Sequence, residues 1–148
     1  SMDLLRNRIE NLLNQQEVHQ QAFQQDPEMD VSSITRSKLD EEFLEHAINV
    51  MEQHMGDVNF SVKEFSDEMC TSRMTLYRKI QTITGLTPSD FMVRVRMKRA
   101  AKLLKETSYP IAIISEMTGF TSQSYFSTAF KAYTGMTPSQ YKKQKASL

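Results

Sequence analysis

Residues 84–91 of this chain read Thr-Gly-Leu-Thr-Pro-Ser-Asp-Phe, and residues 134–141 repeat the pattern as Thr-Gly-Met-Thr-Pro-Ser-Gln-Tyr. In each copy a glycine suited to a helix C-terminus precedes Thr-Pro, where threonine can cap a new helix and proline can occupy its first position. Each copy closes a segment that reads as two short helices joined by a tight turn. A duplicated helix-turn-helix can grip two successive major grooves of duplex DNA.

The composition favours a helical protein. The chain has 148 residues, of which 39% are hydrophobic, so it can bury one moderate core or two small ones. Four glycines, four prolines and the lack of alternating β-branched runs favour helices over sheet. We expect an all-α fold of about seven helices: two helix-turn-helix units joined by a long linker helix and preceded by an N-terminal helix.

Several functional classes find no support in the sequence. The single cysteine, Cys70, excludes an internal disulfide and shows no ligand spacing with the three histidines, so no metal is predicted. We also predict no enzyme and no cofactor, because the chain has no phosphate-cradling glycine loop and no nucleophile and base arrangement. No apolar stretch reaches the roughly 18–20 residues of a membrane span, and no signal peptide opens the chain, so we expect no membrane contact and a cytoplasmic location.

The net charge of zero hides a strong division along the chain. Residues 40–72 hold nine acidic residues and one base, a net charge of −8. Residues 73–148 hold thirteen bases and three acids, a net charge of +10. The positive field is therefore concentrated where the recognition candidates lie, and a neutral total does not exclude nucleic acid.

The first 36 residues read as linker. Residues 1–25 are expected to form a Gln-rich helical linker with a short seam, and Ser1-Met2 resembles a cloning remnant, which suggests a fragment of a longer protein. Residues 26–36, with Pro27 and Ser32-Ser33, are expected to be a flexible linker. The seam consists of Leu5, Ile9, Leu12, Gln16, His19 and Phe23.

Residues 37–148 are expected to form the globular domain. Ser37 is a plausible N-cap for a helix over about 38–55, and Gly56 is placed to end it. The first helix-turn-helix unit covers about 61–85. It starts at Ser61 and Glu64, which have capping-box spacing, and turns at Cys70-Thr71.

The second unit covers about 110–135, with its turn at Gly119-Phe120 and one extra residue near Phe120 relative to the first. A linker helix spans about 89–106, and a short helix of about 138–143 ends the fold. The linker helix has an apolar stripe and a basic stripe, and the basic stripe is equally consistent with phosphate contact and with a solvated face. Its members are Arg94, Lys98, Lys102 and Lys105.

The combined motifs resemble the AraC/XylS-type DNA-binding domain over about residues 40–143. The matching residues are Ser72-Arg-Met-Thr-Leu-Tyr-Arg-Lys, Gly85-x-Thr-Pro, Arg96, Ala100, Leu103-Leu104, Gly119-Phe120, Ser124-Tyr125-Phe126, Phe130-Lys131 and Gly135-x-Thr-Pro. Ile9-Glu-Asn-Leu-Leu and Asp40-Glu-Glu-Phe-Leu further resemble the output end of hybrid two-component regulators from Bacteroidetes. The resemblance implies sequence-specific binding of double-stranded DNA in a transcription regulator. The expected partners are an upstream receiver domain and RNA polymerase. The seam in the N-terminal helix separately suggests a homodimer of the full-length protein.

The resemblance also implies which residues touch DNA. The expected base contacts are Arg73, Met74, Thr75, Arg78, Gln123, Ser124 and Thr128. The expected phosphate contacts are Ser72, Lys79, Arg94, Lys98, Lys102, Ser122 and Lys131. Arg78 can pair with guanine and Gln123 with adenine. Thr128 stands where the family often carries a basic residue, so the first unit is expected to carry more of the specificity.

Other residues have structural or open interpretations. Arg96 lies off the basic stripe and is expected to pair with a carboxylate or a helix terminus. Tyr125 can either pack inward or stack on a sugar. Arg73 and Lys79 can also be plain solvated charges. The competing function is a protein-interaction or dimerisation module, motivated by the seam of residues 5–12, which alone is short for stable pairing.

Overall fold

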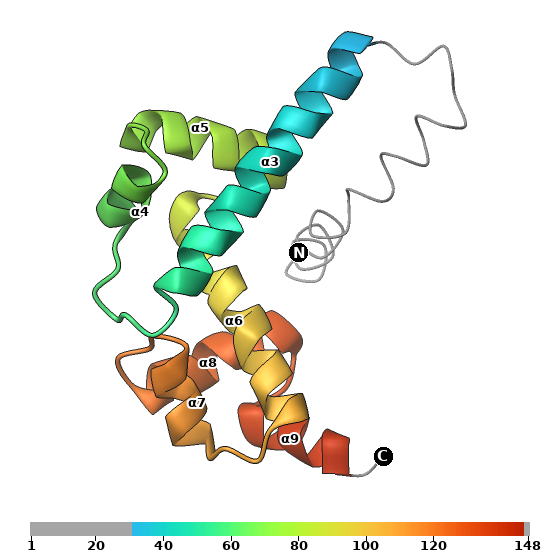
Figure 1. The fold of residues 1–148 in the computed structure, drawn as a ribbon. Helices are drawn as coiled ribbons and strands as arrows, with labels where there is room; N and C mark the ends of the chain where they lie inside the picture. The colour runs from blue at the N-terminus through green and yellow to red at the C-terminus, as the bar shows by residue number, and fades with distance from the viewer. Residues whose placement is uncertain (1–30, 147–148) are drawn as a thin grey trace.

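The computed structural model describes the backbone of residues 31–146 and the side chains of residues 37–144. This part of the chain contains seven helices and no strand (Figure 1), so the all-α prediction is confirmed. The helices are α3 Val31–Gln53, α4 Val62–Glu68, α5 Arg73–Thr84, α6 Pro88–Glu106, α7 Ile111–Met117, α8 Gln123–Thr134 and α9 Pro138–Ala146. Among these seven, none is both long enough and apolar enough to span a bilayer.

The long helix α6 carries two separate hydrophobic cores. Its first half packs with α3, α4 and α5, and its second half packs with α7, α8 and α9. Figure 1 shows the first group above and the second below, with α6 running from one to the other. To the first core α6 contributes Phe91, Met92 and Val95, and to the second it contributes Met97, Ala100 and Leu104. One continuous helix therefore carries both helix-turn-helix units.

The repeated sequence pattern sets the ends of the helices. Ser72 caps α5 and Ser122 caps α8, each by accepting a hydrogen bond from the amide three residues on. Gly85 and Gly135 end the same two helices in the left-handed conformation, with φ of 78° and 84°. The Thr-Pro pairs restart the chain as predicted: Thr87 Oγ1 accepts from the Asp90 amide at 3.2 Å, and proline opens α6.

The two turns share one design. The Thr71 amide donates to Ser66 O at 3.0 Å, and the Phe120 amide donates to Ser115 O at 3.1 Å. The residue before each of these amides has a positive φ, 56° for Cys70 and 80° for Gly119. Cys70 is thus a turn residue, as expected. Because α8 begins one residue later relative to its turn than α5 does, the predicted extra residue near Phe120 is present.

The helix α3 begins earlier than predicted. It starts at Val31, so residues 31–36 are helical and not a flexible linker, and Ser37 lies inside the helix instead of capping it. Between Val31 and Gln53 the chain has no proline or glycine, and serine costs a helix only about 0.5 kcal/mol relative to alanine, so Ser32-Ser33 was a weak stop signal. The helix ends at Gln53, before Gly56. The predicted helix and seam of residues 1–25 lie outside the described residues.

Candidate nucleic-acid interface

Helix α5 presents an outward face to solvent in the first unit. Leu76 and Ile80 are fully buried in the first core, which fixes how the helix faces. Arg73, Met74 and Arg78 are exposed as a result, and Met74 is 70% exposed despite its apolar side chain. A large exposed methionine beside two arginines suits contact with base edges, including a thymine methyl group.

Thr75 is tied into the capping of α5. It is half-buried, and its amide donates to Ser72 Oγ at 3.1 Å. The Ser72 hydroxyl in turn donates to Thr75 Oγ1 at 3.0 Å. At the matching position of α8, Ser122 Oγ accepts from the Tyr125 amide at 3.0 Å. Both serines therefore hold the first turn of their helix, where free amides and the helix dipole favour an anion such as phosphate.

Lys79 is exposed, but its charge lies against α3. The Lys79 Nζ sits 4.9 Å from the centre of the Phe43 ring, in a cation–π contact. Arg78 and Lys79 also line a hollow of about 280 Å³ between α3 and α5 that includes Asp40. The middle of α3, around Asp40 and Phe43, therefore neighbours the basic side of α5, a proximity that the order of elements did not indicate.

Helix α8 presents a less charged outward face in the second unit. Phe126, Phe130 and Tyr133 are buried, as predicted, and Gln123 and Ser124 are exposed in the first turn. Thr128 is exposed, but its hydroxyl donates to the Ser124 carbonyl at 3.1 Å, which leaves the methyl group as the free part of the side chain. Lys131 is exposed in the last turn.

Tyr125 joins the outward face of α8, although the sequence left its role open. It is 54% exposed, and the centre of its ring lies 5.7 Å from the centre of the buried Phe120 ring, so Tyr125 packs on the edge of the core. Tyr125 stands third after the capping serine, as Thr75 does in the first unit. Comparison of the two copies position by position was the signal that could have assigned it.

Arg94 does not belong to the basic stripe, which corrects the expected phosphate contact. Only 6% of Arg94 is exposed, and its guanidinium carbon lies 5.1 Å from the centre of the Tyr133 ring of α8. Residues 91–97 of α6 pass between the two units and are covered on several sides. Helical spacing alone therefore does not predict which of these side chains is exposed. Arg94 therefore anchors the end of α8 against α6.

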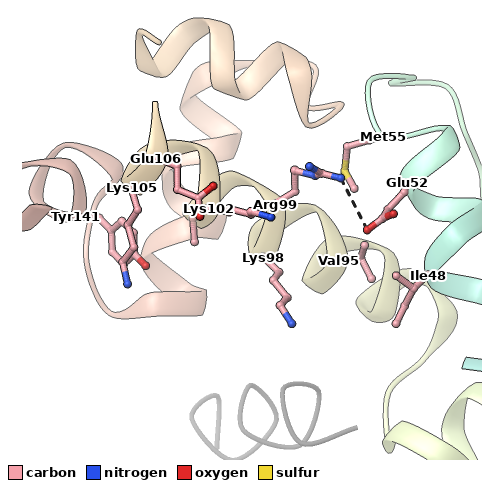
Figure 2. Close-up of a pocket in the computed structure, with 11 residues that line it drawn as sticks. Ile48, Glu52, Met55, Val95, Lys98, Arg99, Lys102, Lys105, Glu106 and Tyr141 are labelled. Carbon is pink, nitrogen blue, oxygen red and sulfur yellow. Dashed lines mark ion pairs between the residues drawn. The ribbon is translucent and has the colours of Figure 1, made fainter. Parts of the chain in front are cut away.

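Lys98 and Lys102 are exposed further along α6, on a hollow of about 430 Å³ between α3, α6 and α9. Figure 2 shows Arg99 reaching across it to Glu52 of α3, with a nitrogen to oxygen distance of 3.8 Å. None of the residues that line this hollow belongs to α5 or α8. Phosphate contact by Lys98 and Lys102 remains a prediction that requires the DNA to reach this side of α6.

Arg96 is structural, as expected. Its guanidinium donates to the carbonyls of Met55, of Thr118 at 2.8 Å and of Asp57 at 3.2 Å. Thr118 ends α7, so a helix C-terminus is among its partners. Burial lowers the pKa of Arg96 from its ordinary value and the nearby Asp57 offsets only part of that effect, yet an arginine stays charged at any physiological pH.

Sequence comparisons place the chain in a known family. A family model described as a helix-turn-helix domain matches residues 65–144, more than half of the chain. The chain is 39% identical over 136 residues to Histidine kinase P4 of Formosa agariphila, which covers 92% of this chain. The same match spans only 10% of the length of that kinase.

Solved structures agree with this placement. The C-terminal domain of AraT, a response regulator from Geobacillus stearothermophilus, is 30% identical with a TM-score of 0.63, over 69% of this chain and 84% of that one. A transcriptional regulator from Chromobacterium violaceum, described as containing an AraC-type DNA-binding domain, is 28% identical with a TM-score of 0.66, over 72% of this chain and 94% of that one. The chain therefore belongs to the AraC-type helix-turn-helix DNA-binding domains.

Proposed function

We propose that this chain binds duplex DNA sequence-specifically as the output domain of a transcription regulator, with α5 and α8 in successive major grooves. One observation carries the proposal. Two capped helices with exposed polar faces are built on the same helix α6, one at each half. Two groove contacts require recognition helices held about one DNA turn apart, and a shared connecting helix is one way to hold them.

The roles of individual residues follow from their exposure. Arg73, Met74 and Arg78 contact bases from α5, and Gln123 and Ser124 do so from α8. Thr75 and Thr128 stay expected base contacts, and the exposed Tyr125 is placed to stack on a sugar. The amides at the starts of both helices hold phosphates, with Lys131 and, on α6, Lys98 and Lys102 adding charge. The first unit carries more of the specificity, because it alone offers guanidinium groups for bidentate pairing with guanine.

The proposed setting is a phosphorelay protein. The similarity to a histidine kinase extends over 92% of the chain, and that kinase is about ten times longer than the match. In the whole protein an upstream receiver would bring two copies together through residues 1–25, and effective concentration would raise the affinity for paired sites. RNA polymerase is the proposed downstream partner, and the cytoplasm the proposed location.

A selection from random duplexes, performed at two salt concentrations, tests the proposed function. We expect a recurring sequence to be enriched, and its affinity to fall as salt rises because phosphate contacts release counterions. Enrichment must persist at the higher salt, since base contacts are less sensitive to screening than phosphate contacts. Retention of all duplexes alike would contradict sequence-specific binding.

The competing function, a dimerisation module, rests on the seam of Leu5, Ile9 and Leu12, which lies outside the described residues. Two heptads are marginal for stable pairing, so we expect a monomer in analytical ultracentrifugation at micromolar concentration. A tight dimer that dissociates in the Leu12→Asp variant would favour the competing function instead.

A further inference from the structure

The side chain of Arg96 is shared by the two helix-turn-helix units. Arg96 lies on α6 between Val95, which belongs to the first core, and Met97, which belongs to the second. Only 6% of it is exposed. Its guanidinium donates to the carbonyls of Met55 and Asp57, in the loop between α3 and α4, and to the carbonyl of Thr118, at the turn of the second unit. One planar group therefore joins a loop of the first unit to the turn of the second.

The two loops approach closely where Arg96 joins them. A Cβ atom on Gly119 would lie 1.8 Å from Arg96 Nη1 and 2.6 Å from Met55 O, so no larger residue fits there without movement. A Cβ on Gly56 would lie 3.7 Å from Met117 O, an ordinary contact distance. The turn of the second unit thus packs directly against the loop that leads into the first.

Two separate cores on one helix do not by themselves fix the angle between the units. Each core packs against its own half of α6, and a slight bend or twist of α6 near Arg96 would change how α5 and α8 are placed relative to each other. Three hydrogen bonds from a buried, planar cation resist that movement, because a guanidinium donates in fixed directions.

We infer that Arg96, accommodated by Gly119, is a positioning residue that sets the relative placement of α5 and α8, and thereby the advantage of a two-groove DNA site over either half. Arg96 itself does not touch DNA in this account. It acts by fixing the position of α8 relative to α5. When α5 binds one groove, α8 is therefore held near the next groove at a high effective concentration. The inference rests on the proposed function.

The first experiment compares full and half sites. The probe is the tightest duplex recovered by selection with the full 148-residue chain, together with two duplexes in which either half is scrambled. Arg96→Met keeps the apolar stem but removes every donor, and Arg96→Lys restores a charge without the planar fork. Arg99→Met is the matched control, because Arg99 lies one turn further along α6 and makes only an exposed ion pair with Glu52.

We expect Arg96→Met to reduce the ratio of full-site to half-site affinity about tenfold while half-site affinities stay unchanged. Arg96→Lys should give an intermediate ratio, and Arg99→Met should equal the unaltered chain. A purely stabilising residue would not move this ratio, because a loss of folded protein lowers full-site and half-site binding equally.

The second experiment measures the placement without DNA. Spin labels at Gln81 of α5 and Ala132 of α8, both exposed, report the distance between the recognition helices. The background is Cys70→Gly, which removes the exposed thiol at a position whose φ of 56° glycine accepts. We expect one narrow distance distribution in the unaltered chain and a broader one in Arg96→Met.

The outcomes separate the two proposals. If the unaltered chain binds selected and random duplexes alike, the proposed function fails. If it prefers the full site but a folded Arg96→Met variant keeps both the affinity ratio and the narrow distribution, the role of Arg96 is overturned. Circular dichroism checks folding. If Arg96→Met does not fold, Arg96→Lys decides, and unfolding of both variants would make Arg96 a stability residue and overturn the inference.

Discussion

Single arginines show how differently one residue type is used in this chain. Arg78 is exposed on α5, Arg94 is stacked on Tyr133, and Arg96 donates to three carbonyls. Formal charge therefore overstates the positive field available to a polyanion. Of the arginines on α6, only Arg99 keeps an accessible head group, and it is paired with Glu52.

Arg78 provides the most direct test of base recognition. Arg78→Ala should weaken binding to the selected duplex by roughly 1–3 kcal/mol and relax discrimination at the base pair it reads, because a bidentate contact to guanine is lost. Competition binding with single-base variants of the duplex measures both effects. Arg99→Ala serves as the control and should leave discrimination unchanged. If the Arg78→Ala variant bound the selected duplex and random duplexes each with the same affinity as the unaltered chain, the assignment of Arg78 would be refuted.

Two glycines with the same backbone conformation should differ in what they tolerate. Gly135 has φ of 84° and open space around it, so Gly135→Ala should cost only the left-handed strain, about 1–2 kcal/mol of unfolding free energy. Gly119 has φ of 80° and a guanidinium and a carbonyl against it, so Gly119→Ala should cost clearly more. Urea unfolding of both variants measures the difference. Equal losses would mean that the Arg96 contact yields without cost.

At the scale of elements, helix boundaries were predictable from local sequence signals, whereas contacts between residues distant in the chain were not. Ser72, Gly85 and Thr87 act within one helical turn, so the boundaries of α5 and α6 were readable from sequence. The burial of Arg94 and the contact of Lys79 with α3 were not readable from the sequence, because their partners, Tyr133 and Phe43, lie far away in the chain. Exposure of the recognition residues was predictable, since the apolar face of each helix leaves only one side free.

The exposed face of α6 gives a prediction at this scale. Lys98→Ala should weaken all duplexes similarly and reduce the salt dependence of binding by about one phosphate contact. A titration of affinity against salt concentration measures the slope. Lys38→Ala, which removes an exposed lysine from α3, is the control and should leave the slope unchanged. If the slope of the Lys98 variant also stays the same, the lysines beside the α3, α6 and α9 hollow form a solvated face.

At the scale of the whole molecule, charge and architecture favour the same interaction. Residues 40–72 hold nine acidic residues and one basic residue. Residues 73–148, which contain both recognition helices, hold thirteen basic residues and three acidic ones. Two small cores on one helix support two DNA-binding units, and Arg96 fixes the position of one unit relative to the other. Affinity should therefore come from phosphates along the duplex, and specificity from two short stretches of bases.

Chemical footprinting of major-groove guanine and adenine positions on the selected duplex tests this claim most directly. If α5 and α8 enter successive major grooves, two protected patches should lie about 10 base pairs apart on one face of the DNA. The Arg78→Ala variant should weaken protection chiefly in one patch, which assigns that patch to α5. A single protected patch, or two patches on opposite faces of the duplex, would contradict the account.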